Sequence, residues 1–196
     1  MNDFDNVLVN VKNSFRLLYS FNSRLLDLMK YIGKRFNLPY SGGWTKFSAS
    51  SPKDGKGSLD NWAWDWLNLY LYEFHFSKEE IKFSIVFQAD TGKWDSEVDY
   101  LDVDKFEKAE KTKTKLIFIF SNNEYWDMDM ALDDKYMGNE YENEYSIENE
   151  NKDKIYCKIF ELNDFKNKKE IDQALDKYIK YLNKNKIFDI TIVEEV

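Results

Sequence analysis

The N-terminal segment of the chain carries a spacing of apolar side chains that limits how the whole protein can fold. From Phe4 to Phe36, apolar residues recur one, three or four positions apart, and Asn, Lys and Arg lie largely on the opposite side. This spacing predicts a long amphipathic helix that ends before Pro39. At about 1.5 Å per residue the helix would extend about 50 Å, which exceeds the width of a compact domain of this size. We therefore expect a break near Asn22 and Ser23.

After this segment the sequence changes from a helical to a strand-like pattern. Leu38–Asn61 contains glycines and both prolines and is predicted to be a long loop. Trp62–Phe76 is aromatic and aliphatic without helical spacing, and Ile81–Ala89 alternates with period two. Joined by a turn at Ser77–Glu80, these two segments predict a β-hairpin.

The remaining apolar segments complete the predicted fold. Lys115–Phe120, Lys154–Leu162 and Ile187–Val193 are strand-like, whereas Lys168–Lys184 has helical spacing. Strands and helices do not alternate, which argues against a doubly wound fold. The order predicts a single α+β domain over residues 1–196. It would have a long N-terminal helix, a mostly antiparallel four- to five-stranded sheet, and a C-terminal amphipathic helix packed on the sheet.

Composition predicts a core rich in aromatic rings. Hydrophobic residues make up 43% of the chain and aromatic residues 17%, which is enough to build a packed core. The single cysteine, Cys157, lies in an apolar run, and one cysteine excludes an intramolecular disulfide and a zinc site of clustered cysteines. No apolar stretch is long enough for a signal peptide or a membrane span, so we expect a cytoplasmic protein.

The negative charge of the chain is concentrated in one segment, Ser121–Asp153. Eleven acidic residues and two lysines give this segment a net charge of −9, whereas the whole chain carries −8, so the other residues sum to +1. Tyrosine, tryptophan and methionine are interleaved with the acids. We interpret the segment as an acidic, aromatic-containing insertion, either a solvated loop or a docking surface for a basic partner. Its candidate binding residues are Asp127, Asp129, Asp133 and Asp134.

A basic region precedes the predicted hairpin. Lys30–Gly57 carries a net charge of +5, with aromatic residues interleaved, a combination that can bind phosphate or a single nucleic-acid strand. Candidate binding residues in and after this region are Trp44, Lys46, Trp62, Trp64 and Trp66. The last three alternate, so on a strand they would share one face, either buried in the core or exposed as a stacking platform. The sequence leaves open whether the acidic segment docks on this basic region of the same chain.

A candidate catalytic set lies around the hairpin. Glu80-Ile-Lys82 has the Glu-x-Lys spacing of metal-dependent nucleases, in which residues on one strand face support a metal ion and water. Glu73 would supply the preceding acid, and Asp90 follows the second strand, although an aspartate close to a glycine is more typical of a turn. The spacing is frequent by chance in a chain rich in Glu and Lys. We therefore predict no cofactor or metal and keep these residues as an alternative.

His75 is the only histidine, and it lies between Phe74 and Phe76. Histidine often serves as a general acid or base because it titrates near neutral pH. No serine or cysteine partner can be identified from the sequence. We interpret His75 as a packed strand residue.

Together these patterns favour a non-enzymatic cytoplasmic interaction module of the immunity or phage-conflict kind. It would use its acidic segment toward a protein partner with a basic surface; nucleic acid is a less favoured partner, and no membrane association is predicted. The alternative is a metal-dependent nuclease or phosphoryl-processing enzyme that uses the carboxylates near the first hairpin. A third hypothesis is a module that stacks bases or sugars around Trp62–Trp66.

Overall fold

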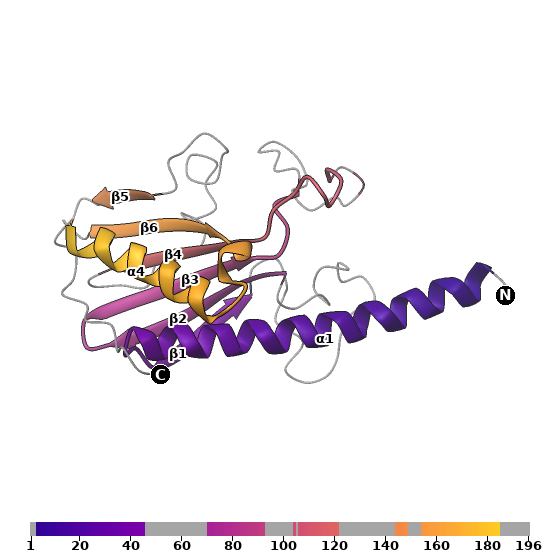
Figure 1. The fold of residues 1–196 in the computed structure, drawn as a ribbon, viewed down its shortest axis with the longest axis horizontal. Coiled ribbons are helices and arrows are strands. Elements are labelled where there is room, and N and C mark those ends of the chain that lie inside the picture. The colour runs from indigo at the N-terminus through magenta and orange to yellow at the C-terminus, as the bar shows by residue number, and fades with distance from the viewer. Residues whose placement is uncertain are drawn as a thin grey trace.

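The computed structural model of the chain describes residues 3–45, 70–92, 104, 106–121, 144–148 and 154–184. A long helix comes first, strands follow, and a short 3-10 helix leads into the last helix (Figure 1). The elements are α1 Asp3–Arg35, β1 Tyr40–Thr45, β2 Leu71–Lys78, β3 Ile81–Gln88, β4 Lys115–Ser121, β5 Glu144–Glu148, β6 Lys154–Glu161, η3 Leu162–Phe165 and α4 Lys168–Lys184.

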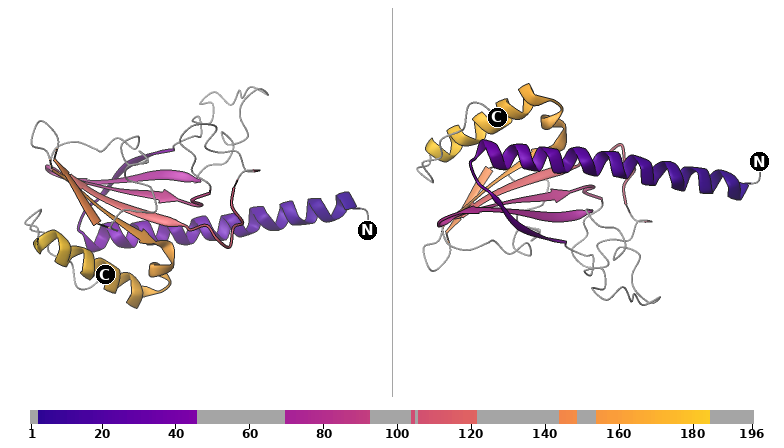
Figure 2. Two further views of the ribbon diagram at one scale, coloured as in Figure 1. Left: turned by 90° about the horizontal axis from the view of Figure 1, so that it is seen from above. Right: turned by 90° about the horizontal axis from the view of Figure 1, so that it is seen from below.

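The strands form one antiparallel sheet in the order β1-β2-β3-β4-β6-β5. Helices α1 and α4 lie on the same face of this sheet (Figure 2). The arrangement confirms the predicted α+β fold with an N-terminal helix, an antiparallel sheet and a C-terminal helix. Within the described residues the sheet has six strands, more than predicted, because β1 and β5 fall in segments that were predicted as a loop and as an insertion.

Strand β1 shows why local signals were insufficient for the edge of the sheet. Gly42 and Gly43 give the segment a low intrinsic preference for a strand. The strand forms because it pairs with β2, where Tyr40 lies opposite Phe76. β2 itself begins at Leu71; residues 62–69 and the closing strand predicted at 187–193 lie outside the described residues.

Strands β2 and β3 form the predicted hairpin. Leu71 lies opposite Gln88 and Lys78 opposite Ile81, so the register is continuous along both strands. The turn consists of Glu79 and Glu80. Because side chains alternate between the faces of a strand, this register decides which residues face the helices and which face away.

The predicted break in the N-terminal helix is wrong. Helix α1 runs without interruption through Asn22 and Ser23. The break was predicted because the helix is longer than a compact domain is wide. The helix stays unbroken because its N-terminal half projects beyond the sheet (Figure 1). Burial begins at Phe21, which is half-buried and lies 5.9 Å from the ring of Phe87, and Leu25 is the first fully buried residue.

The core lies between the two helices and the sheet, and it is built mainly from aromatic rings. The rings of Phe83 and Phe120 stack with centroids 4.3 Å apart. Phe36, which directly follows α1, packs edge-on against Phe83 at 5.1 Å, and Tyr178 from α4 packs edge-on against Phe118 at 5.4 Å. Edge-to-face and stacked contacts at these distances stabilise beyond the area they bury. The predicted aromatic core is therefore confirmed.

Gly33 allows α1 to approach the sheet closely, and its replacement tests that contact. A Cβ atom at Gly33 would lie 2.7 Å from Cε1 of the buried Phe76 ring and 3.1 Å from the backbone oxygen of Leu38. Alanine normally stabilises a helix by about 1 kcal/mol relative to glycine. Here we expect Gly33→Ala to lower the free energy of unfolding by about 1–3 kcal/mol in urea titrations, because the ring must shift.

The control is Ser20→Ala on the exposed part of the same helix, which gains helix propensity without meeting the sheet. It should leave stability unchanged or slightly higher. Equal effects of the two substitutions would show that the close approach at Gly33 is not what holds α1.

Candidate functional site

The most unusual surface of the described chain is the projecting half of α1, residues 3–20, which we call the α1 arm. Every residue of the arm is exposed. Large apolar side chains are among them, including Phe4 at 65% exposure and Phe15 at 69%. Scattered exposed apolar residues are ordinary on protein surfaces, but a contiguous patch marks an interaction site.

Some of the apolar residues of the arm form a regular heptad pattern that runs along the whole helix, whereas Val7, Val9, Leu17 and Tyr19 are exposed outside it. Two rows of positions recur every seven residues: Leu8, Phe15, Asn22, Met29 and Phe36 in one, and Phe4, Val11, Leu18, Leu25 and Ile32 in the other. We call these rows the α1 stripe. A spacing of alternately three and four residues is the pattern with which helices pack against partners. It is interrupted only by Asn22, at the point where the arm meets the sheet domain.

The two halves of the stripe have different surroundings. Its C-terminal members, from Leu25 onward, are buried in the core against the sheet and α4. Its N-terminal members, from Phe4 to Leu18, are exposed. The stripe that holds α1 on its own domain therefore continues for about 21 Å, at 1.5 Å per residue, along a surface where it is exposed.

On the opposite side of α1 one row is polar along the full length of the helix, and Leu17 lies next to it. The row that lies farthest from the stripe consists of Asn6, Asn13, Ser20, Asp27 and Lys34. The arm is thus amphipathic in the same sense as the buried half of the helix. Exposure to solvent suits the polar side of the arm and is unfavourable for the side that carries the α1 stripe.

The arm is a helix of weak intrinsic preference. Asp3 and Asp5 in the first turn interact favourably with the positive end of the helix dipole. Between them and Ser20, however, three asparagines and three valines each cost a few tenths of a kcal/mol relative to alanine. Isolated helices of this length are marginal in water even with better residues, and helices in proteins are stabilised mainly by packing. The composition favours an arm that packs against something.

The C-terminal half of α1 is anchored to α4 by polar contacts. The Arg35 side chain is buried, with Nε 3.6 Å from Asp172 Oδ1 and Nη2 3.6 Å from Asp176 Oδ1. The Tyr31 hydroxyl donates to Asp172 Oδ1 at 2.8 Å. Burial and the Asp172 carboxylate raise the pKa of Tyr31 above its ordinary value. These contacts set the direction in which the arm leaves the domain.

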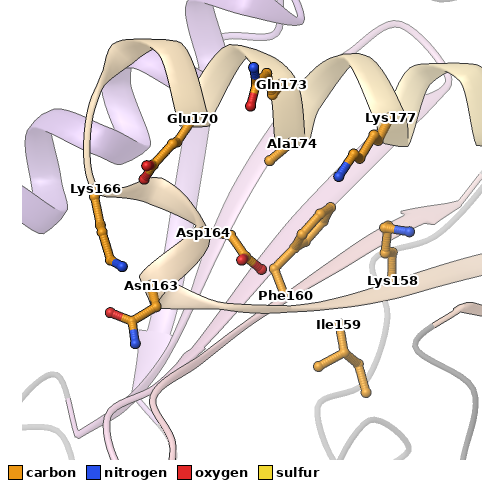
Figure 3. Close-up of a pocket in the computed structure, with 10 residues that line it drawn as sticks. All are labelled: Lys158, Ile159, Phe160, Asn163, Asp164, Lys166, Glu170, Gln173, Ala174 and Lys177. Carbon is orange, nitrogen blue, oxygen red and sulfur yellow. The ribbon is translucent and has the colours of Figure 1, made fainter.

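A polar cleft of about 410 Å³ opens between β6, η3 and α4 (Figure 3). Lys158 and Lys177 lie on one part of its wall, and Asp164 and Glu170 on another. Burial and the nearby Lys177 lower the pKa of Lys158, whose Nζ lies 5.4 Å from the centroid of the Phe160 ring. Because the cleft carries both signs of charge, it favours no particular class of ligand.

The structure does not bring the candidate catalytic residues together. Glu80 lies in the hairpin turn, before β3, and Asp90 lies beyond the far end of the same strand. Ten residues of extended chain separate them by about 33 Å. The Asp90 carboxylate accepts a hydrogen bond from the Gly92 N–H at 2.8 Å, which is a turn contact. Lys82 is the second residue of β3, next to the turn and opposite Ser77.

Glu73 instead pairs with His75. Both are buried on the face of the sheet that points away from the helices, and Glu73 Oε1 lies 2.7 Å from His75 Nε2. Ser84 lies opposite His75 on β3. The placement agrees with His75 as a packed strand residue, and the partner could have been anticipated because residues two apart share a strand face. Among the described residues, no group of three or more His, Cys, Asp or Glu side chains is arranged to hold a metal ion.

The candidate binding residues are only partly within the described chain. Trp44 lies on the edge strand β1 and is 69% exposed. The others lie outside the described residues: Lys46, Trp62, Trp64, Trp66, Asp127, Asp129, Asp133 and Asp134. The α1 arm was not recognised from the sequence as a site. The signal was present, because the stripe extends far beyond the length that a sheet of short strands can cover.

Within the part of the chain that the structure describes, no helix is both long enough and apolar enough to cross a membrane.

Residues 1–187 match the model of the PM0109 family, and the chain therefore belongs to that family. Comparison with curated proteins and with solved structures gave no match. The family membership covers nearly the whole chain, including α1 and the sheet domain.

The contact between Tyr31 and Asp172 predicts a pH-dependent contribution to stability. Because the pKa of Tyr31 is raised in the folded protein, its contribution is fully present below about pH 10, the ordinary tyrosine pKa. It is lost as the pH rises through the raised folded-state pKa. We expect Tyr31→Phe to lower the free energy of unfolding at pH 8 by at most about 1 kcal/mol.

The difference between the wild-type protein and Tyr31→Phe should shrink as urea titrations are repeated above about pH 10. Other tyrosines with raised pKa values are present in both proteins, so their effects cancel in this comparison. A difference that grows with pH would contradict the assignment.

Proposed function

We propose that this PM0109 family member is a non-enzymatic interaction protein that binds other protein chains through the α1 arm. The observation that carries the proposal is the continuation of the α1 stripe from the buried core onto an exposed, projecting helix. A helix that presents apolar residues at three- and four-residue spacing is a common docking element for a protein groove or a second helix. The sheet domain would serve as the rigid body that holds the arm.

The acidic segment is proposed as a second contact surface, directed toward a basic partner. Its net charge of −9 lies on a chain whose other residues sum to +1. Charge of one sign on a defined segment raises the rate and selectivity of association more than the affinity. A cytoplasmic location is part of the proposal, since the single cysteine offers no intramolecular disulfide. No described arrangement favours the nuclease alternative or the stacking module over this function.

Site-specific photo-crosslinking tests the arm directly. A photoreactive phenylalanine analogue is placed at Phe15, on the stripe, or at Asn13, on the polar side, in cells that express the full chain. We expect protein adducts of defined mass from position 15, because that side chain would be enclosed by a partner, and few from position 13. Adducts are detected on denaturing gels and identified by mass spectrometry.

Equal adducts from the two positions, or none from position 15, would exclude the arm as a binding element. Because both positions are exposed on the same stretch of helix, differences in expression or folding do not explain a difference in crosslinking. The identity of the adduct is a separate result from its presence.

Neutralising the acidic segment tests the second surface. We expect Asp127→Asn, Asp129→Asn, Asp133→Asn and Asp134→Asn together to reduce, in cell lysate at low salt, the position-15 adducts with proteins other than this chain. The reduction should disappear at about 0.5 M salt, where exposed charges are screened.

The matched control neutralises four exposed acids elsewhere, namely Glu80, Glu107, Glu110 and Asp164. It changes the net charge of the chain by the same amount. A similar reduction in both variants would show that overall charge, and not the acidic segment, is responsible. Substitution is preferable to deletion because β5 lies within the segment and pairs with β6.

A further inference from the structure

We infer that the α1 arms of two copies of this chain pair in an antiparallel manner, so that the occupant of the exposed stripe is a second copy of the protein. The inference rests on the proposed function and specifies only what covers the arm; the basic partner proposed for the acidic segment is a separate contact. It follows from the position of the stripe relative to the sheet, from the length of the arm and from the order of charges along it.

The position of the stripe decides the direction of pairing. Its buried half faces the sheet of its own chain, and on a straight helix a heptad row drifts by only about 20° per repeat. A second helix that covers the exposed half therefore lies in line with the edge of that sheet. If it ran parallel, it would meet the sheet where α1 first packs on it, at Phe21 and Phe87. An antiparallel helix can end before this point.

The shape of the molecule accommodates the antiparallel arrangement. The arm projects away from the sheet, with the N-terminus at its far tip (Figure 1). In a two-fold pair, the tip of each arm reaches the start of the other copy's sheet domain, and the two domains lie at opposite ends. Each arm then ends close to the point where α1 of the other copy first packs on its sheet, at Phe21 and Phe87.

The heptad rows specify a register for this pair. Antiparallel helices pack one row of each helix against the other row of its partner. Phe15 then lies against Phe4 of the second copy, and Leu8 against Val11 of the second copy. In this register the exposed members of the stripe from Phe4 to Phe15 in one arm pack on the same stretch of the other arm.

The charges of the arm are complementary in the same register. Asp3 and Asp5 lie at the tip of the arm, and Lys12 and Arg16 lie farther along. Antiparallel pairing places Asp5 next to Lys12 of the second copy, and symmetry repeats the pair. In a parallel pair Lys12 would instead lie next to Val7 of the second copy, without an acidic partner. The opposed helix dipoles also favour the antiparallel pair.

The size of the contact sets the strength that can be expected. Standard interfaces take about 20–30 residues from each partner, and the arm offers fewer. We therefore expect a dimer that forms in the micromolar range, with part of the binding free energy used to order a helix of weak preference. Dimer formation and helix content should rise together with protein concentration.

Sedimentation of the full chain over about 1–200 µM tests the pairing. We expect a concentration-dependent dimer, and we expect Val11→Asp with Phe15→Asp to weaken it by at least about 100-fold, because the pair would bury charges. The matched control, Asn6→Asp with Asn13→Asp, places the same charges on the polar side and should dimerise like the wild type. Thermal unfolding of both variants checks that the sheet domain remains folded.

Cysteine crosslinking determines the direction of the pair and does not depend on a disruptive variant. In a Cys157→Ala background, chains carrying Phe4→Cys are mixed with chains carrying Phe15→Cys and oxidised. We expect a mixed disulfide dimer and little homodimer of either chain. Homodimers in place of the mixed dimer would indicate parallel pairing and overturn the inference.

The outcomes separate this inference from the proposed function. The wild-type chain could stay monomeric at every concentration while position 15 forms adducts with a different protein. This result would overturn the inference that a second copy covers the stripe, and it would still support the proposed function. A position-15 adduct that consists of two copies of this chain supports both. Loss of dimer in the polar-side control as well as in the stripe variant would assign pairing to another surface and overturn the inference.

Discussion

The structure depends on the contact between the C-terminal half of α1 and the sheet. Ile32 and Phe36 enter the aromatic core, and Gly33 brings the helix backbone within a short distance of the Phe76 ring. The close approach leaves little freedom of rotation, because ring and helix interlock at close-packed density. Arg35, buried beside Asp172 and Asp176, connects the same turn to α4. Once this half is held, the direction of the arm follows from the rigidity of the helix.

A mismatch of lengths explains why an arm exists. Strands of eight residues, such as β2 and β3, extend about 26 Å, whereas α1 extends about 50 Å. A helix that long can cover the sheet with only part of its length. The composition of the uncovered part of α1 matters more than its length. A polar extension would be solvated, but this one repeats the apolar rows that hold the other half of the helix in the core. The same pattern is thus used for folding in one half and is available for association in the other.

The register of the sheet governs the remaining candidate chemistry. Alternation along β2 places Glu73 and His75 together on the face away from the helices, and it directs Phe74 and Phe76 into the core. Glu80 and Asp90 are separated by the full length of β3, although they are close in sequence. Spacing along the chain therefore indicated residue types suited to catalysis but not whether they converge. The cleft beside α4 shows the opposite situation. Lys158 and Gln173 both line it, although they are far apart in sequence and belong to no common motif.

Local pattern alone determined several elements of this protein. The helical spacing of α1 and α4, the period-two alternation of β3 and the aromatic core are all legible in the sequence, because they result from short-range geometry and burial. Contacts between segments that are distant in the sequence determined the other elements. Strand β1, with Gly42 and Gly43, becomes a strand only when β2 supplies its hydrogen bonds. The continuity of α1 through Asn22 and Ser23 depends on whether the helix must stay within the domain. That is a property of the tertiary structure, because only the size and position of the sheet determine how much of the helix is covered.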